Sequence, residues 1–139
     1  QVYLEPGEAA ITNSTTLEVT VLDTLFNGKH LAIVDSSIEA HMLDLLIYRE
    51  SAKMEESGDH QWMVCGKSCL AGDIFGEFRF PQPLKPGDRL SIQDAAGYTM
   101  VKKNWFNGVQ MPAIAIRELD GSTRLVRDFT YADFSAALS

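Results

Sequence analysis

Tight turns divide this sequence into short runs of β-branched and apolar residues, and this spacing restricts the fold more than any other feature. Asn27-Gly28 and Asp120-Gly121 are strong hairpin signals, because these residue types tolerate the positive φ angles of two-residue turns. Pro86-Gly87-Asp88 marks another turn. Short extended runs between such turns predict a mainly β domain, folded as an antiparallel barrel or sandwich.

The expected strands are rich in Val, Ile, Thr and aromatic side chains, which suit a pleated surface. They cover residues 1–4, an extended region within 9–26, and then 29–34, 61–66, 76–80, 89–94, 113–119 and 123–127. The pattern changes after residue 36, where Met42, Leu45 and Leu46 fall at helical spacing and predict a short helix within 37–48. Residues 131–138 predict a terminal amphipathic helix, capped by Asp128 or Thr130.

Length and charge exclude several classes of protein. The 139 residues are enough for one domain with a core. A net charge of -7 with scattered Lys and Arg disfavours nucleic acid and anionic membranes as partners. No apolar run approaches the length of a membrane span, and we expect no signal peptide. The cysteines, Cys65 and Cys69, form neither a disulfide framework nor a C-x-x-C motif, which favours a reduced cytoplasmic setting.

Three places combine glycine with groups that can act on a ligand. They are Glu5-Pro-Gly-Glu8, the stretch Gly66–Gly76 around Cys69, and Asp94–Thr99 followed by Asn104–Gly108. Glycine lets the backbone approach a ligand closely, and a tyrosine hydroxyl can bond a phosphate oxygen. Each motif alone is common, and a lone cysteine is more often a small buried side chain.

Other chemistries find no support in the sequence. The three histidines share no metal-ligand spacing, so we expect no metal site. No G-x-S-x-G elbow, P-loop or dinucleotide fingerprint occurs.

Four strings in this order resemble the C-terminal part of the alanine-racemase-fold (fold type III) pyridoxal-phosphate (PLP) decarboxylases. They are Tyr3-Leu-Glu-Pro-Gly-Glu-Ala9, Asp35-Ser-Ser with Ala40-His-Met and Asp44, Ser68-Cys-Leu-Ala-Gly-Asp73, and Gly97-Tyr-Thr-Met-Val-Lys with Asn104-Trp-Phe-Asn-Gly108. The resemblance covers essentially the whole chain. Within that family it is most similar to the enzymes that convert carboxynorspermidine and carboxyspermidine to norspermidine and spermidine.

The resemblance implies roles for individual residues around PLP. Glu5 would keep the pyridine nitrogen of the cofactor protonated, and Gly7 and Tyr98 would hold its phosphate. Cys69 would reach across a homodimer interface and act as general acid. Phe106 and Asn107 would shape the same rim.

Substrate contacts follow from the same resemblance, which places Glu8, Asp44 and Asp73 at the substrate. Two positions depart from the ornithine and diaminopimelate enzymes, which carry arginine where this chain has Glu8 and aspartate where it has Leu70. An anion at position 8 suits a polyamine-like substrate with additional ammonium groups. If Glu8 and Asp44 instead are rim charges in water, the substrate assignment loses this support.

The resemblance also sets the expected domain organisation. Residues 1–8 would be the last strand of a (β/α)₈ barrel, and residues 9–139 the C-terminal β-domain. The sequence opens without Met inside a strand-like run, and none of its lysines matches the family's cofactor-binding lysine. We therefore expect half of an active site, completed by an N-terminal barrel in the same protein or a separate chain.

Three alternatives stay open at this point. The chain could belong to a non-catalytic regulatory or binding homologue. It could be part of a diaminopimelate- or ornithine-type decarboxylase. It could also be a free-standing antiparallel β binding module unrelated to PLP.

Overall fold

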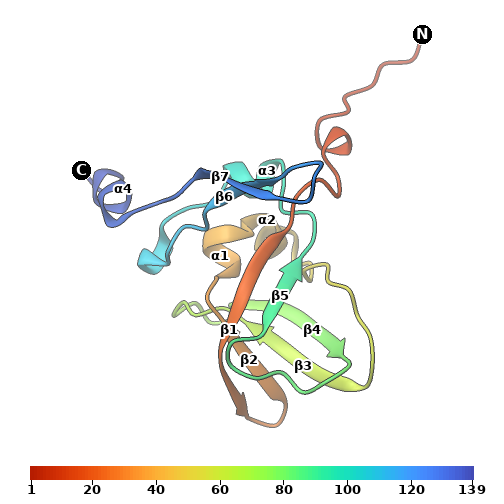
Figure 1. Ribbon diagram of the computed structural model, residues 1–139, viewed down its shortest axis with the longest axis vertical. Coiled ribbons are helices and arrows are strands. Elements are labelled where there is room, and N and C mark those ends of the chain that lie inside the picture. Colours follow the sequence, from red (N-terminus) through yellow and green to blue (C-terminus); the bar gives the residue numbers. More distant parts are fainter.

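The computed structural model describes all 139 residues of the chain, and Figure 1 shows how its strands and helices are arranged. The strands are β1 (Leu17–Phe26), β2 (His30–Val34), β3 (His60–Cys65), β4 (Ile74–Phe80), β5 (Arg89–Ile92), β6 (Ile114–Arg117) and β7 (Thr123–Arg127). The helices are α1 (Ile38–His41), α2 (Leu43–Tyr48), α3 (Tyr98–Val101) and α4 (Tyr131–Ala136), with single 3₁₀ turns η1 (Glu8–Ala10) and η2 (Phe106–Gly108). None of these helices has the length and apolarity needed to cross a bilayer.

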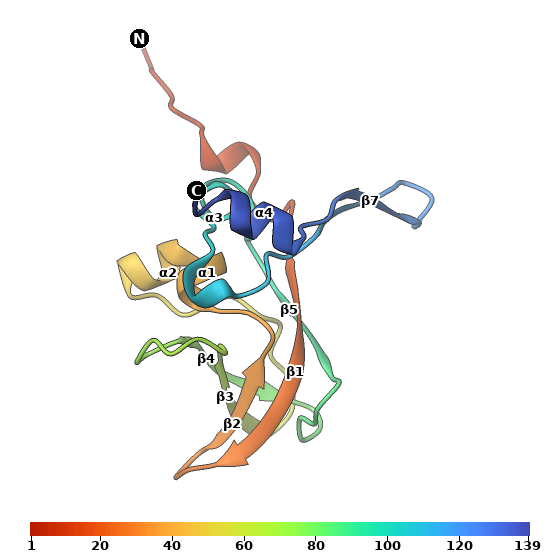
Figure 2. The same ribbon diagram turned by 90° about the vertical axis from the view of Figure 1, so that its left-hand side faces the viewer.

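Five strands form one curled sheet in the order β4-β3-β2-β1-β5 (Figures 1 and 2). The expected hairpin at Asn27-Gly28 joins β1 to β2, and all pairs in this sheet are antiparallel except β2 with β3. The expectation of a purely antiparallel sheet is wrong at that pair. Parallel neighbours need a long crossover, and the segment between β2 and β3 supplies it with α1 and α2.

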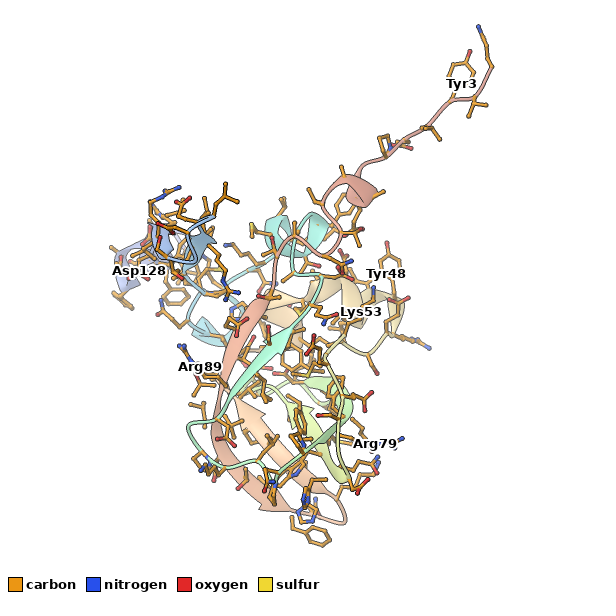
Figure 3. The ribbon with its side chains drawn as sticks, turned by 45° about the vertical axis from the view of Figure 1, so that its right-hand side comes forward. Tyr3, Tyr48, Lys53, Arg79, Arg89 and Asp128 are labelled. Carbon is orange, nitrogen blue, oxygen red and sulfur yellow. The ribbon has the colours of Figure 1, made fainter.

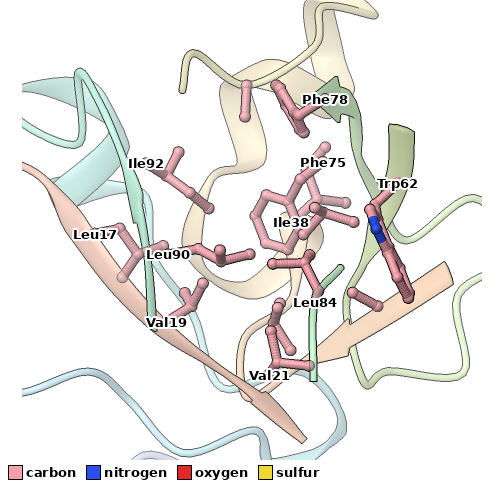
Figure 4. Close-up of a cluster of buried hydrophobic side chains, with 14 of the residues drawn as sticks. Leu17, Val19, Val21, Ile38, Trp62, Phe75, Phe78, Leu84, Leu90 and Ile92 are labelled. Atoms are coloured by element: carbon pink, nitrogen blue, oxygen red, sulfur yellow. The ribbon is translucent and has the colours of Figure 1, made fainter. Parts of the chain in front are cut away.

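The curled sheet encloses the hydrophobic core, seen in Figure 4. On β1, Leu17, Val19 and Val21 are buried and alternate with more exposed residues, as a half-buried strand requires. Phe75 on β4 is completely buried among side chains from the other strands. The core therefore lies within residues 17–95, and the C-terminal segments lie outside it.

The helix predicted after residue 36 is confirmed, but the chain breaks it into two. Ser37 caps α1 and accepts a hydrogen bond from the Ala40 N–H at 3.4 Å. Met42 has φ −138° and ψ 48°, which is not helical, and its side chain is buried in the core. Tertiary packing of Met42 thus interrupts a run whose spacing alone predicts one helix.

The C-terminal region forms a separate layer. Strands β6 and β7 make a two-stranded hairpin, as predicted around Asp120-Gly121, and α4 follows with Thr130 and Asp133 forming the capping box at its start. A hairpin alone is marginally stable in water, and every residue of β7 is exposed. Trp105 packs against Phe129 and Phe134, which ties α4 to the segment after α3.

The N-terminal segment differs most from the sequence expectation. Residues 1–6 are extended and exposed without strand pairing, and the tail points away from the sheet (Figure 1). The predicted strand at Gln1–Leu4 is therefore not formed within this chain. A strand needs a neighbour to receive its hydrogen bonds, and no other segment of the chain runs beside this one. Likewise, the start of the extended region within 9–26 is taken by η1, so β1 begins at Leu17.

Candidate active site

One pocket of about 410 Å³ brings together three of the predicted site residues. Glu8 comes from η1, Asp44 from the first turn of α2, and Tyr98 from the start of α3. Tyr48 and Lys53 also line it, and Figure 3 shows both on the same flank of the molecule. Residues 8 and 98 are distant in sequence, so tertiary structure creates this pocket.

A close approach at Gly97 places Glu8 beside Tyr98. Gly97 has φ 58° and ψ −128°, a conformation that other residues rarely adopt. A Cβ atom at Gly97 would lie 2.8 Å from Ile11 Cδ1 and 3.3 Å from Glu8 Oε1. The turn before α3 is thus packed against η1, and its backbone conformation favours glycine.

Lys102 pairs with Asp44, which lines this pocket. Its Nζ lies 2.5 Å from Asp44 Oδ1 and 4.9 Å from the centre of the Tyr98 ring. The hydrogen bond to Asp44 raises the pKa of Lys102. In this chain, therefore, the carboxylate expected to meet a substrate ammonium group already holds a cation.

Asp94, just after the C-terminal end of β5, connects this region to the N-terminal segment by a hydrogen bond. Its Oδ1 accepts the Asn13 N–H at 2.9 Å and its Oδ2 lies 2.7 Å from Lys53 Nζ. The hydrogen bond from Lys53, followed by that from Asn13, lowers the pKa of the Asp94 carboxyl group. These contacts fix the wall of the pocket next to Glu8.

Cys69 lies on a second site, the loop between β3 and β4, and its side chain is exposed. It does not line the pocket that contains Glu8 and Tyr98. The Cys69 N–H donates to Asn107 Oδ1 at 2.9 Å, which connects this loop to η2. Cys65, at the end of β3, is buried, and this burial raises the pKa of its thiol.

Asp73 is buried at the base of the Cys69 loop. Its Oδ1 accepts the Ile38 N–H at 2.8 Å, and its Oδ2 accepts the N–H and the hydroxyl of Ser68 at 3.0 and 2.5 Å. A Cβ atom at Gly66 would lie 2.2 Å from Asp73 Oδ1, so the carboxylate sits directly against that glycine. Both oxygens are engaged within the chain, and contact of Asp73 with substrate stays a prediction.

A buried histidine adjoins the same region. His41, at the end of α1, has its Nδ1 2.8 Å from the Ser36 hydroxyl, while its Nε2 has no partner. Burial lowers the pKa of His41 to about 4, and the nearby charges of Lys103 and Lys67 act in the same direction. His41 is therefore neutral at physiological pH.

The remaining predicted residues, Glu5 and Gly7, do not line the pocket. Glu5 is exposed on the N-terminal tail, whose far end carries Tyr3 in Figure 3. Gly7 precedes η1, and the space around its Cα is open. The chain alone thus assembles Glu8, Asp44 and Tyr98, holds Cys69 and Asp73 together elsewhere, and leaves Glu5 apart. No group of three or more His, Cys, Asp or Glu side chains is arranged to hold a metal ion.

The residue reasoning missed two partners in these sites. Lys102 ends one of the four strings without an expected role, and α3 turns it towards Asp44. Asn107 was assigned to a rim, whereas its side chain binds the backbone of Cys69. The Asn-Gly pair at 107–108 is a turn signal, and Asn107 indeed has a positive φ of 55°.

Comparisons with known proteins show the family of this chain. Residues 10–96 match the family model described as "Pyridoxal-dependent decarboxylase, C-terminal sheet domain". The whole chain is 69% identical to the carboxynorspermidine/carboxyspermidine decarboxylase of Herminiimonas arsenicoxydans, covering 38% of it. It is 40% identical to the carboxyaminopropylagmatine decarboxylase of Synechocystis, with 96% of this chain and 36% of that protein covered.

A solved structure matches almost the whole chain. The crystal structure of carboxynorspermidine decarboxylase from Campylobacter jejuni, complexed with norspermidine, superposes with a TM-score of 0.89 at 35% identity. The match covers 99% of this chain and 42% of that chain. This chain therefore spans about two fifths of the length of the relatives it matches.

The matched residues 10–96 contain the curled sheet and the Cys69 loop, and they define the C-terminal sheet domain of a pyridoxal-dependent decarboxylase. The chain belongs to the pyridoxal-dependent decarboxylase family. This result confirms the family and the fold class that the four sequence strings suggest.

The residues present fit a phosphorylated cofactor of this kind. The Tyr98 side chain is 59% exposed, lines the pocket and carries a hydroxyl that can bond a phosphate oxygen. Gly7 offers an open backbone approach on the adjoining turn. Lys102 also lies over the Tyr98 ring, and its positive charge is paired with Asp44.

Proposed function

We propose that the complete protein is a PLP-dependent carboxy-lyase that decarboxylates carboxynorspermidine or carboxyspermidine in polyamine biosynthesis, and that this chain is its C-terminal portion. The observation that carries this proposal is the 69% identity, over the whole chain, to a carboxynorspermidine/carboxyspermidine decarboxylase. The acidic pocket with Glu8 and Asp44 gives it a physical basis, because carboxylates suit the ammonium groups of a polyamine.

Four residues of the chain have proposed roles in catalysis. Tyr98 and the backbone at Gly7 hold the phosphate, and Glu5 holds a proton on the pyridine nitrogen. When bound, the cofactor withdraws electrons from the substrate carbon that loses CO₂. The Cys69 thiol then donates its proton to that carbon, which replaces the bond to CO₂ by a bond to hydrogen.

The proposed assembly explains why the residues are separated in this chain. Residues 1–8 would form the last strand of a (β/α)₈ barrel, which would position Glu5 and supply the cofactor-binding lysine. A homodimer would bring Cys69 of one subunit to the pocket of the other. We also place the enzyme in the cytoplasm, since both cysteines are free.

The test compares the complete protein with the isolated 139-residue chain. We expect the complete protein with PLP to release CO₂ from carboxynorspermidine and carboxyspermidine, and to act far less on diaminopimelate or ornithine. The isolated chain lacks the lysine and should show no turnover and no cofactor-lysine absorbance. Turnover by the isolated chain would overturn the two-part site, and a preference for diaminopimelate would overturn the substrate.

Carboxyaminopropylagmatine is a second candidate substrate. It is supported by the 40% identity to the carboxyaminopropylagmatine decarboxylase of Synechocystis. The same assay discriminates between the two, because the ratio of their kcat/KM values measures the preference directly. We expect the ratio to favour carboxynorspermidine, in line with the higher identity.

A further inference from the structure

A closed ring of hydrogen bonds surrounds the backbone of the Cys69 loop. The ring starts at α1, whose first N–H, that of Ile38, donates to Asp73 Oδ1 at 2.8 Å. Asp73 Oδ2 then holds Ser68, the residue before Cys69, through its N–H and hydroxyl. One side of the loop is thereby tied to α1.

The other side of the loop returns to the same helix through η2. The Cys69 N–H donates to Asn107 Oδ1 at 2.9 Å. Asn104 Oδ1 accepts the N–H of Phe106, the neighbour of Asn107, at 2.8 Å. Asn104 also donates from its backbone to Ala40 O at 2.8 Å and from its side chain to Glu39 O at 3.0 Å, both on α1.

The ring fixes three consecutive amide groups of an otherwise glycine-flanked loop. The N–H groups of Ser68, Cys69 and Leu70 bond to the side chains of Asp73, Asn107 and Ser68 in turn. None of these three amides is part of a strand or helix. Side chains therefore hold these three amides, while backbone bonds from Lys67 N–H to Ser36 O at 2.9 Å and from Asp73 N–H to Leu70 O at 3.1 Å fix the loop on either side of them.

We infer that Asn107 and Asp73 are positioning residues for Cys69, holding its backbone so that the thiol meets the substrate carbon at one angle. This inference rests on the proposed role of Cys69 as proton donor. Asn107 is the more informative of the two, because it contacts Cys69 directly and is itself exposed. Its φ of 55° suits Asn, Asp and Gly better than other residues.

These conformational preferences supply a matched set of variants in the complete holoenzyme. Asn107→Asp keeps the acceptor oxygen and the backbone conformation. Asn107→Gly keeps the conformation but removes the acceptor, and Asn107→Ala removes the acceptor and strains the backbone. Comparison of Gly with Asp thus isolates the hydrogen bond to Cys69.

Two readouts follow Cys69 independently. The first is the amide hydrogen exchange of the peptide that contains residues 68–70, which reports on the bond without any turnover. The second is the fraction of aldehyde by-product, which forms when the proton reaches the wrong atom. We expect Asn107→Gly and Asn107→Ala to speed exchange at least tenfold, to lower kcat about tenfold and to raise the aldehyde fraction. Asn107→Asp should resemble the unchanged enzyme, and KM should stay constant throughout.

Ser68→Ala is a second variant that perturbs the hydrogen-bond ring, and it can be used if the Asn107 variants do not fold. It removes one hydroxyl bond to Asp73 and should move both readouts in the same direction by a smaller factor. If Asn107→Gly, or Ser68→Ala in its place, leaves exchange and aldehyde fraction unchanged, the positioning role is overturned. Cys69→Ala, measured in parallel, separates the role of Cys69 as proton donor from the positioning role of Asn107. A normal product ratio in Cys69→Ala would overturn the proposed proton donor and this inference with it, whereas aldehyde in Cys69→Ala alone would overturn only the inference.

Discussion

The Cys69 loop and the Glu8–Tyr98 pocket differ in how many of their polar groups find hydrogen-bond partners within this chain. Around Cys69 the polar groups of the loop find partners within the chain, and Asp73 is buried with both oxygens engaged. At the pocket, Tyr98 and Glu8 are exposed. The conformation of the loop is thus fixed within this chain, and the Cys69 thiol is exposed on it. The pocket, in contrast, has exposed side chains that are free to contact a ligand or the rest of the protein.

The largest effect should come from removing the buried carboxylate that supports the loop. Asp73→Ala leaves the N–H of Ile38 and both donors of Ser68 without their acceptor. We expect a loss of about 3–4 kcal/mol in the free energy of unfolding, measured by urea titration of the complete protein. Asp59→Ala, at an exposed aspartate, is the control and should change little. Equal stability of the two variants would contradict a supporting role for Asp73.

The thiol itself should affect chemistry and leave stability intact. In the complete enzyme Cys69→Ala should lower the rate of product formation about 100-fold and raise the aldehyde fraction, because a general acid contributes at least this much. Cofactor affinity should not change, since the thiol is not placed at the phosphate. Cys65→Ala is the control, because Cys65 is buried and contributes packing alone. An unchanged product ratio in Cys69→Ala would return this cysteine to an ordinary exposed side chain.

The buried His41 next to the loop predicts a pH dependence of stability. The unfolded chain protonates this residue below pH 6.5, while the folded chain does so only below about pH 4. The unfolded state therefore binds more protons between these values, and stability is lost as the pH falls through this window. We expect His41 to account for about 2 kcal/mol of the loss between pH 7 and pH 5.

Variants separate this contribution from that of other titrating groups. His41→Gln should flatten the dependence over this interval, whereas His60→Gln, at an exposed histidine, should leave it as it is. Urea unfolding at both pH values measures the difference. Parallel pH profiles for His41→Gln and the unchanged protein would show that His41 does not titrate in the fold as its burial requires.

The smallest effects should come from the pocket, and they should appear in substrate binding alone. Glu8→Gln and Asp44→Asn should each raise KM for carboxynorspermidine about tenfold, because a carboxylate bonds an ammonium group more strongly than an amide does. Lys102→Met should lower KM, since it removes the cation that now pairs with Asp44. Glu55→Gln, at an exposed site, is the control. If Asp44→Asn and Glu55→Gln have the same effect on KM, the role of Asp44 is to pair with Lys102, and the substrate binds elsewhere.

The sequence by itself determined the elements that depend on neighbouring residues. The Asn27-Gly28 and Asp120-Gly121 turns are local patterns that the structure confirms, and of the two cap candidates, Asp128 and Thr130, it is Thr130 that caps α4. The order of the four strings also suggested the family, which the comparisons confirm. Such features are predictable because turn conformation and side-chain periodicity are set within a few residues.

Tertiary structure alone decided the features that depend on distant segments. The parallel pairing of β2 with β3 follows from how α1 and α2 fold back, and the break at Met42 follows from its burial in the core. The pairing of Lys102 with Asp44 joins residues 58 positions apart, and the bond from Cys69 to Asn107 spans 38. No local pattern contains these distances, because burial and hydrogen bonding are satisfied by whichever segments the closed core brings together.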